Sequence, residues 1–269
     1  MTGAVAARNI LIERACDGGM SLAGSSMFIG TASELLEAIS SILGQRMRAE
    51  YIMTLNVDQV LQLRTNQELF SAFESAVLRT VDGVPLTWVG SAIGTNHVYR
   101  NTGADLLYLA CQEGAQRNWK IVIAGGPSGQ ANQAASNLAS LYPGLRVIGL
   151  DFPIIETPED PSSLDLVSEI NRAQPDLVFL CLGCPKQELW FSAWRSKLEP
   201  AVYVGAGAAV GFASGSLSRA PSFIQRYGFE WLWRLAQDPR RLAHRYLIKG
   251  PGFLSVFVKS FRASIRGES

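Results

Sequence analysis

Residues 177–190 read LVFLCLGCPKQELW, and this stretch decides the fold class. Its first six side chains are all apolar, which predicts a strand buried on both faces, as in a parallel sheet covered by helices. The chain then passes through glycine and proline to Lys186, Gln187 and Glu188, which precede a helix predicted over residues 187–197. Three polar side chains at a strand end are costly to bury unless they are paired or used. This loop is therefore a candidate functional site.

The same alternation of apolar strand, loop and helix continues on both sides of this stretch. Predicted strands cover residues 51–55, 79–81, 120–124, 146–150, 177–182 and 201–204. Predicted helices cover residues 58–64, 71–78, 102–117, 130–141, 164–172 and 187–197, with Thr102 as the N-cap of the third. We therefore expect an α/β protein with a Rossmann-like, mostly parallel sheet covered by helices and a C-terminal helical appendage. Such sheets bind their ligands at the carboxyl ends of the strands.

Charge is distributed unevenly along the 269 residues. Residues 219–269 contain ten Lys or Arg and three Asp or Glu, a net +7, which leaves 14 against 20, or −6, for residues 1–218. The balance of 24 basic and 23 acidic residues in the whole chain argues against a nucleic-acid-binding protein. The basic, aromatic tail indicates either contact with an anionic surface or a solvated basic face. We expect an N-terminal arm (1–27), an α/β catalytic core (28–215) and a C-terminal appendage (216–269).

Localisation follows from what the sequence lacks. No apolar stretch reaches the roughly 18 residues of a membrane span, and the N-terminus has no continuous apolar segment of the kind found in signal peptides. The four cysteines show no disulfide-framework spacing. We expect a cytoplasmic protein, associated peripherally with the inner face of the cell membrane.

Two loops after predicted strands contain candidate reacting groups. Thr54 and Asn56 end the first strand, where they either cap the next helix or hydrogen-bond a ligand. Asp82, followed by glycine, ends the second strand. It is either a turn residue or a general base placed to take a proton from an acceptor hydroxyl.

Two further loops are candidates for anion binding. Arg100, Gly103 and Asp105 open a helix, where an arginine and free backbone N–H groups can hold a phosphate or orient a sugar. Gly125 and Gly126 follow a strand and allow a ligand to approach the backbone closely. The second pattern matches neither G-x-G-x-x-G nor the Walker P-loop, so it is weak evidence for nucleotide binding.

Three other chemistries are disfavoured. Cys181 and Cys184 have redox-motif spacing, but Cys181 is inside an apolar strand and the chain has only two histidines, which disfavours a zinc site. Residues 205–211 (GAGAAVG) approach the dinucleotide fingerprint with the third glycine one position late and no strand-end acid about 20 residues on. Neither His97 nor His244 has a serine or cysteine nucleophile elbow to serve a hydrolase triad.

At these loops the sequence resembles the WecG/TagA/CpsF glycosyltransferases (family 26) of bacterial surface-polysaccharide and teichoic-acid assembly. The similarity runs from about residue 28 to about residue 254. It depends on ordered motifs: Thr54-Leu55-Asn56, Asp82-Gly83, Arg100-x-x-Gly103-x-Asp105, Gly183-Cys184-Pro185-Lys186-Gln187-Glu188-x-Trp190, Arg219-Ala220-Pro221, Glu230-Trp231-Leu232-x-Arg234-Leu235 and Pro239-Arg240-Arg241. So many motifs in the same order make a chance match improbable.

The resemblance implies an inverting, metal-independent transfer of a hexose or N-acetylhexosamine-type sugar, with no cofactor. The donor is a UDP-sugar, and the acceptor is a polyprenyl-diphosphate-linked glycan at the inner membrane surface. Asp82 matches the proposed catalytic base, and Thr54 and Gln187 match residues of the active-site pocket. Arg234 and Arg241 match arginines of an appendage thought to close over the site and neutralise the diphosphate. Where a third basic residue is often arginine, this chain has His244 beside Arg245, and which of them serves stays open.

The loops and the resemblance together predict a set of substrate-binding residues around the catalytic group. They are Asn56, Arg100, Gly103, Asp105, Gly125, Gly126, Lys186, Glu188, His244 and Arg245. At the loop after Gly207 many members read G-G-x-F-D, whereas this chain reads Ala208-Ala209-Val210-Gly211, a departure that bears on donor preference.

Two alternatives remain open. The first is a nucleotide-binding protein with the same sheet and no transfer activity, either regulatory or dehydrogenase-like. The second concerns residues 246–261, where apolar residues surround Lys249 and Lys259: this segment either packs on the core or lies on anionic lipid.

Overall fold

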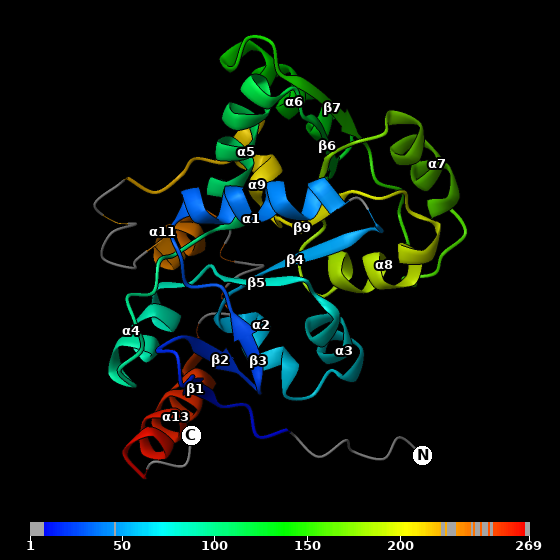
Figure 1. The fold of residues 1–269 in the computed structure, drawn as a ribbon. Helices are drawn as coiled ribbons and strands as arrows, with labels where there is room; N and C mark the ends of the chain where they lie inside the picture. Colours follow the sequence, from blue (N-terminus) through cyan, green and yellow to red (C-terminus); the bar gives the residue numbers. More distant parts are fainter. Residues whose placement is uncertain are drawn as a thin grey trace, which may run out of the picture.

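A six-stranded parallel sheet forms the centre of the molecule (Figure 1). The computed structural model describes residues 8–45, 47–221, 224, 230–237, 239, 243, 247 and 250–266, with the backbone alone at Glu230 and Arg234. The strands are β4 (Glu50–Leu55), β5 (Leu78–Val81), β6 (Lys120–Gly125), β7 (Arg146–Leu150), β8 (Leu177–Cys181) and β9 (Val202–Gly205). Their order is β5-β4-β9-β8-β6-β7, with every pairing parallel. The predicted α/β class and parallel sheet are confirmed.

Helices cover both faces of the sheet. They are α1 (Ala32–Gln45), α2 (Val57–Leu63), α3 (Gln67–Ser75), α4 (Val84–Ala92), α5 (Gly103–Arg117), α6 (Gln130–Leu141), α7 (Ser163–Ala173), α8 (Lys186–Trp194) and α9 (Ala209–Ala213). The helices α2, α3, α4, α7 and α8 share one apolar cluster, and α1, α5, α6 and α9 share the other. Successive strand residues alternate between the clusters, as Tyr51 and Ile52 do in β4. The strands are therefore buried on both faces, which explains their apolar sequences.

A small antiparallel sheet precedes the parallel one. Its strands are β1 (Ile12–Arg14), β2 (Met20–Leu22) and β3 (Ser25–Met27), paired in the order β1-β2-β3. These residues lie in the predicted N-terminal arm (1–27), where no strand is predicted, because three-residue strands are too short to show an alternating pattern.

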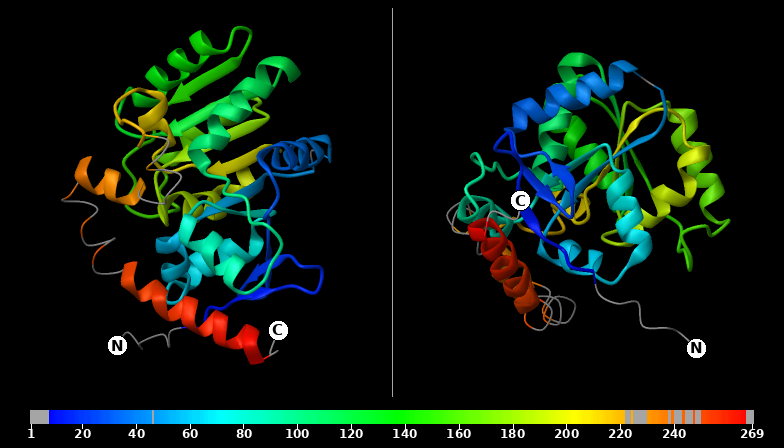
Figure 2. Two further views of the ribbon diagram at one scale, coloured as in Figure 1. Left: turned by 90° about the vertical axis from the view of Figure 1, so that its left-hand side faces the viewer. Right: turned by 60° about the horizontal axis from the view of Figure 1, so that its bottom comes forward.

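The C-terminal end of the chain returns to this small sheet. The backbone N–H of Ile12 donates to Ser260 Oγ at 2.8 Å, and Ser260 lies in α13 (Phe253–Arg266). Both views of Figure 2 show α13 beside the small sheet. Among the described residues of the appendage, α11 (Glu230–Gln237) and the 3₁₀ turn Gly250–Gly252 precede α13. The helical nature of the appendage is confirmed for these described segments.

Most predicted elements differ from the observed ones by one to four residues at their ends. The helix predicted over 187–197 ends as α-helix at Trp194 and continues as a 3₁₀ turn, Arg195–Lys197. The helix predicted over 71–78 begins at Gln67, because Asn66 caps it by accepting a hydrogen bond from the Leu69 N–H at 2.9 Å. Thr102 is the N-cap of α5, as predicted.

Candidate functional site

The carboxyl ends of β4 and β9 are fastened together by Thr54. This residue is 4% exposed, and its hydroxyl donates to the carbonyl oxygen of Gly205 at 2.6 Å. Asn56 follows as the N-cap of α2 and accepts hydrogen bonds from the N–H groups of Asp58 and Gln59 at 3.0 and 3.2 Å. The capping interpretation of Asn56 is thus confirmed, while substrate contacts of Thr54 and Asn56 stay predictions.

Asp82 lies directly beside the Asn56 loop. Its backbone N–H donates to the carbonyl oxygen of Leu55 at 2.7 Å, and a Cβ added to Gly83 would lie 3.7 Å from the Asn56 Cα. Asp82 is half-buried, so its carboxylate is not sealed in the core. The predicted base and the predicted pocket residues of β4 therefore share one edge of the sheet.

Arg100 lies at the same edge of the sheet, because the next residue, Asn101, is hydrogen-bonded to the end of β5. The Asn101 N–H donates to the Val81 carbonyl oxygen at 2.7 Å, which places Arg100 one residue from the end of β5. Its guanidinium lies 3.9 Å from Asp105 Oδ2. Arg100 is half-buried and lies between the Asp82 loop and the start of α5.

Asp105 connects this edge to the beginning of the appendage. Its Oδ1 accepts a hydrogen bond from Arg219 Nη1 at 2.6 Å, and its Oδ2 accepts one from the Thr102 hydroxyl at 2.7 Å. Burial raises the pKa of Asp105, but these hydrogen bonds and the charges of Arg219 and Arg100 outweigh it and hold that pKa below its usual value. The carboxylate is therefore committed to a structural ion pair. Arg219 belongs to the Arg219-Ala220-Pro221 motif, and its partner lies 114 residues away, beyond the reach of any local sequence pattern.

Gly103 allows α5 to approach the end of β9. A Cβ at this buried position would lie 2.8 Å from the Ala206 Cα and 3.1 Å from the Gly205 carbonyl oxygen. Such separations are too short for any side chain, so close packing explains this glycine. Its predicted role in substrate binding stays a prediction.

The three polar residues that follow β8 separate as α8 begins. Lys186 is exposed, whereas Gln187 is 2% exposed and Glu188 is fully buried. The Gln187 side chain accepts hydrogen bonds from the N–H groups of Gly183 and Gly207, each at 3.1 Å. The requirement that such residues be paired is met by Gln187 and Glu188. Ligand contacts of all three stay predictions.

The glycine loop after β6 lies against the end of β7. Gly125 is buried with φ 114°, and a Cβ there would meet the Cys181 carbonyl oxygen at 2.9 Å. Gly126, half-buried with φ 83°, also requires the left-handed region. Asp151, exposed after β7, accepts hydrogen bonds from the Ser128 hydroxyl at 2.7 Å and the Gly129 N–H at 2.9 Å. The hydroxyl of Ser128 and the N–H of Gly129 in this loop are therefore already bound to the Asp151 carboxylate. Ligand binding by Gly125 and Gly126 stays a prediction.

Four predicted residues of the appendage cannot be placed in this geometry. Arg241, His244 and Arg245 lie outside the described residues, and for Arg234 the description gives the backbone of α11 without the side chain. Their roles stay predictions from the resemblance.

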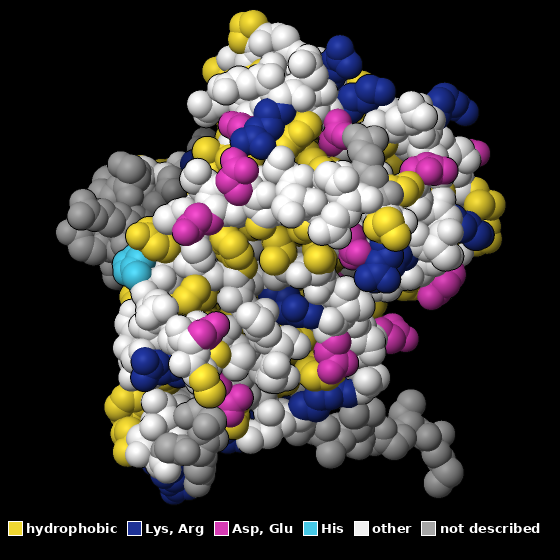
Figure 3. Space-filling view, in the orientation of Figure 1, with side chains coloured by type: hydrophobic (Ala, Val, Ile, Leu, Met, Phe, Trp, Pro, Cys, Tyr) yellow, Lys and Arg dark blue, Asp and Glu magenta, His cyan; other side chains and the backbone are white. Residues whose placement is uncertain are grey.

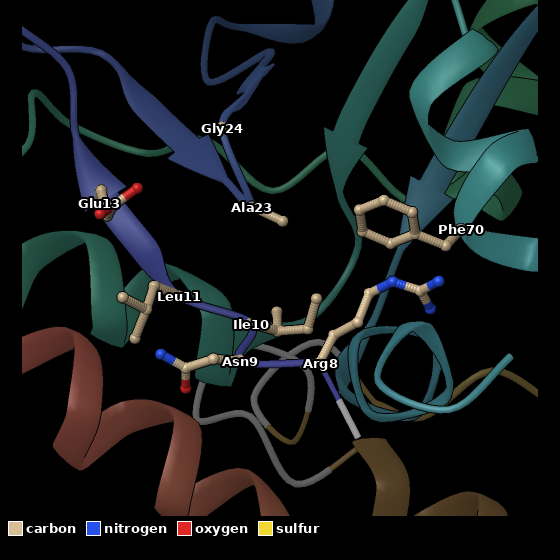
Figure 4. A pocket seen from close by; sticks show the side chains of 8 residues that line it. All are labelled: Arg8, Asn9, Ile10, Leu11, Glu13, Ala23, Gly24 and Phe70. Atoms are coloured by element: carbon tan, nitrogen blue, oxygen red, sulfur yellow. The ribbon is translucent and has the colours of Figure 1, made fainter. Parts of the chain in front are cut away.

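A hollow of about 440 Å³ lies elsewhere on the molecule (Figure 4). The N-terminal segment, the turn between β2 and β3, and Phe70 of α3 line it, and the Arg8 guanidinium lies 4.5 Å from the centre of the Phe70 ring. None of its lining residues belongs to the strand-end loops. The hollow is therefore not part of the candidate site.

Three further observations concern the described part of the molecule as a whole. Within the described ranges, no three His, Cys, Asp or Glu side chains gather closely enough to hold a metal ion. Within the same ranges, no helix is long and apolar enough to span a membrane. On the face drawn in Figure 3, Lys and Arg side chains are interspersed with Asp and Glu, so that face has no continuous basic surface.

Comparison with known proteins gives a consistent result. Residues 20–266 match the model of the family described as "Glycosyl transferase WecG/TagA/CpsF family". A protein of Bacillus spizizenii is 26% identical over 219 residues, which are 81% of this chain and 82% of that protein. A protein of Bacillus subtilis (strain 168) is 25% identical over 190 residues, or 71% of this chain and 72% of that protein. Both are named N-acetylglucosaminyldiphosphoundecaprenol N-acetyl-beta-D-mannosaminyltransferase.

The family match spans β2 and β3 of the small sheet, the parallel sheet with its strand-end loops, and α13, while β1 precedes it. It therefore covers every described element that positions the candidate site, and it confirms the resemblance drawn from the ordered motifs. The chain belongs to the WecG/TagA/CpsF family of glycosyltransferases.

Proposed function

We propose that this glycosyltransferase moves an N-acetylhexosamine-type sugar, or a hexose, from a UDP-sugar to a polyprenyl-diphosphate-linked saccharide. The observation that carries the proposal is the packing of the Asp82 loop against the Asn56 loop, beside Arg100, in a chain of this family. The two Bacillus relatives are named for transferring N-acetylmannosamine to N-acetylglucosaminyl-diphosphoundecaprenol, which supports the acceptor class.

In the proposed reaction, Asp82 takes the proton from the acceptor hydroxyl. The acceptor oxygen forms a bond to the anomeric carbon from the face opposite UDP, so the configuration at that carbon inverts. The bond between that carbon and the UDP oxygen breaks, and the diphosphate keeps the electron pair. A half-buried carboxylate suits a general base, because it is reachable by substrate and held by its backbone.

The departing diphosphate requires positive charge. Arg100 is next to Asn101, whose N–H donates to the Val81 carbonyl oxygen just before Asp82. Arg234 and Arg241 of the appendage are proposed to complete the charge, with His244 or Arg245 as a third group. Each well-placed group of this kind stabilises a transition state by roughly 3–4 kcal/mol. Such charge takes the part that a divalent metal plays in other transferases, so metal independence is included in the proposal.

The appendage is proposed to meet the membrane that holds the acceptor. On α13, Phe253, Val256 and Ser260 are buried against the protein, while Leu254, Val258, Phe261 and Ile265 form an exposed apolar stripe with spacings of four, three and four residues. The exposed Lys259, Arg262 and Arg266 follow the neighbouring face of the helix. An apolar stripe beside cations is typical of a helix that lies in the interface of an anionic bilayer.

This membrane proposal is tested by co-sedimentation with vesicles of phosphatidylglycerol and phosphatidylcholine. We expect wild-type protein to sediment with the anionic vesicles and Phe261→Asp to remain largely in the supernatant. Exposed Leu141→Asp on α6 is the matched control, and it should partition as wild type does. Equal partitioning of Phe261→Asp and wild type would reject the stripe as an anchor.

The transfer reaction is tested by following UDP release from a panel of UDP-sugars, with and without a short-chain polyprenyl-diphosphate N-acetylglucosamine. We expect UDP release with one or a few of the donors, and only when the acceptor is present. Excess EDTA should not lower the rate of UDP release. Stabilisation against heat by NAD and not by UDP, or no release with any donor, would contradict the proposal.

A further inference from the structure

Glu188 is fully buried beneath the strand-end loops, yet three polar side chains point at it. Its Oε1 accepts hydrogen bonds from Gln187 Nε2 at 2.9 Å, from Gln59 Nε2 at 3.2 Å and from the Tyr51 hydroxyl at 3.4 Å. The donors come from α8, α2 and β4, so one carboxyl oxygen joins three elements.

The side-chain carbonyl oxygen of each of the two glutamines accepts hydrogen bonds from backbone N–H groups of the loops. Gln59 Oε1 accepts from the Asn56 N–H at 2.9 Å, after β4. Gln187 Oε1 accepts from the N–H groups of Gly183 and Gly207, each at 3.1 Å, after β8 and β9. Since an amide has its acceptor and its donors on opposite sides, a carboxyl oxygen that binds both NH₂ groups turns both carbonyl oxygens toward the loops.

We propose that Glu188 is a positioning residue that acts through Gln59 and Gln187 to fix the loops after β4, β8 and β9 relative to one another. Asn56 packs on Gly83, so the same set of bonds also supports the backbone beside Asp82. The inference extends the proposed function, because these loops surround the reacting groups. We call Glu188, Gln59 and Gln187 the buried relay.

The relay uses the lone pairs of Glu188 and not its charge. Burial raises the pKa of Glu188, which favours the neutral carboxyl, although hydrogen bonds from Gln187 and other neighbours lower it. Its Oε2 has no nitrogen or oxygen donor within hydrogen-bonding distance among the residues the structure describes. A glutamine at this position would therefore keep the accepting oxygen and place its NH₂ group where Oε2 now lies.

Local packing constrains the side chains of Tyr51 and Gln187, which both donate to Glu188. A Cβ at Gly205 would lie 2.2 Å from the Tyr51 hydroxyl oxygen and 2.6 Å from Gln187 Nε2, so both side chains pass directly over the backbone at the end of β9. The Tyr51 ring stacks on Phe191 with ring centres 4.8 Å apart, which holds its hydroxyl in place. The donors are thus held toward Glu188 by their surroundings.

The experiment compares Glu188→Gln with Glu188→Met in the full-length protein. We measure kcat, the KM for the donor, the Tm, and hydrogen exchange at the N–H groups of Asn56, Gly183 and Gly207. Ser163→Ala is the matched control, because it removes the buried hydroxyl that accepts from Trp190 Nε1 of the same helix at 3.0 Å.

We expect Glu188→Gln to lose at least about tenfold less of kcat than Glu188→Met does, because it keeps the accepting oxygen. Glu188→Met should lower kcat about 10²-fold, because misplacement of about 1 Å in a reacting site has that effect. The three N–H groups should exchange roughly tenfold faster in Glu188→Met and at the wild-type rate in Glu188→Gln. Ser163→Ala should lower Tm without changing kcat or these three exchange rates.

Several outcomes would overturn the inference. Wild-type kcat and exchange in Glu188→Met would show that the loops do not depend on Glu188, and an equal loss of kcat in Glu188→Gln would show that its charge acts directly. If Glu188→Met does not fold, Gln59→Met breaks one arm, and unchanged exchange at Asn56 would then reject the relay. A wild type that transfers no sugar would refute the proposed function, while the exchange rates would still decide the relay.

Discussion

The strands β8 and β6 are equally buried, but the loops that follow them differ, because one places its polar residues in the core and the other places them at the surface. After β8, Gln187 and Glu188 enter the core. After β6, Ser128 and Gly129 are exposed and held by Asp151 at the surface. The two loops have different neighbours: β8 lies between β9 and β6, whereas the loop after β6 lies beside the end of the edge strand β7, which Asp151 follows. Polar residues at a central strand end can fix several loops at once, whereas those at an edge fix one turn.

The largest effect on this contrast is expected from Gly205→Ala at the end of the central strand β9. The new Cβ would displace the Tyr51 hydroxyl and the Gln187 amide, both of which bind Glu188. Overpacking of this kind destabilises by about 1–3 kcal/mol, and kcat should fall together with Tm. Thermal melting and the UDP-release assay measure the two effects.

A glycine in open space serves as the control for that substitution. Gly44 of α1 has no atom within 4 Å of an added Cβ. Gly44→Ala should therefore leave the free energy of unfolding unchanged or raise it by up to about 1 kcal/mol, and Tm should not fall. If Gly205→Ala left both Tm and kcat at their wild-type values, the central loops would not be as tightly coupled as the contacts imply.

A smaller effect is expected from Asp151→Ala at the edge. The substitution removes hydrogen bonds to Ser128 and Gly129 in an exposed turn, which should lower the unfolding free energy by about 1 kcal/mol. Turnover should stay within about threefold of wild type, since no other strand-end loop is bound to Asp151 by the hydrogen bonds described. A loss of kcat with unchanged Tm would place the β6 loop within the reacting site and remove the distinction.

Much of the parallel sheet could be predicted because its strands are short apolar runs between recognisable helices. Thr102 capped its helix as expected, and of the three residues expected to be paired if buried, Gln187 and Glu188 are buried and paired. Which of the three would turn inward could not be predicted. The partners of Glu188 are Gln59 and Tyr51, 129 and 137 residues away, and no local pattern records such distant contacts.

The small sheet could not be predicted for a different reason. Each of β1, β2 and β3 has three residues, and β1 is held in part by Ser260 of α13, 248 residues away. Strands this short are stabilised by tertiary packing more than by their own sequence pattern. Family motifs, by contrast, predict roles for Asp82 and Arg100 without any knowledge of their neighbours, since motifs depend on residue order and not on contacts.

The most direct test concerns the carboxylate of Asp82. Asp82→Asn keeps the size of the side chain and the backbone bond to Leu55, so donor binding and Tm should match wild type. Removal of a general base should lower kcat by about 10²–10⁴-fold in the complete reaction with UDP-sugar and lipid-linked acceptor. A turnover close to that of wild type would contradict the assignment of Asp82 as the base.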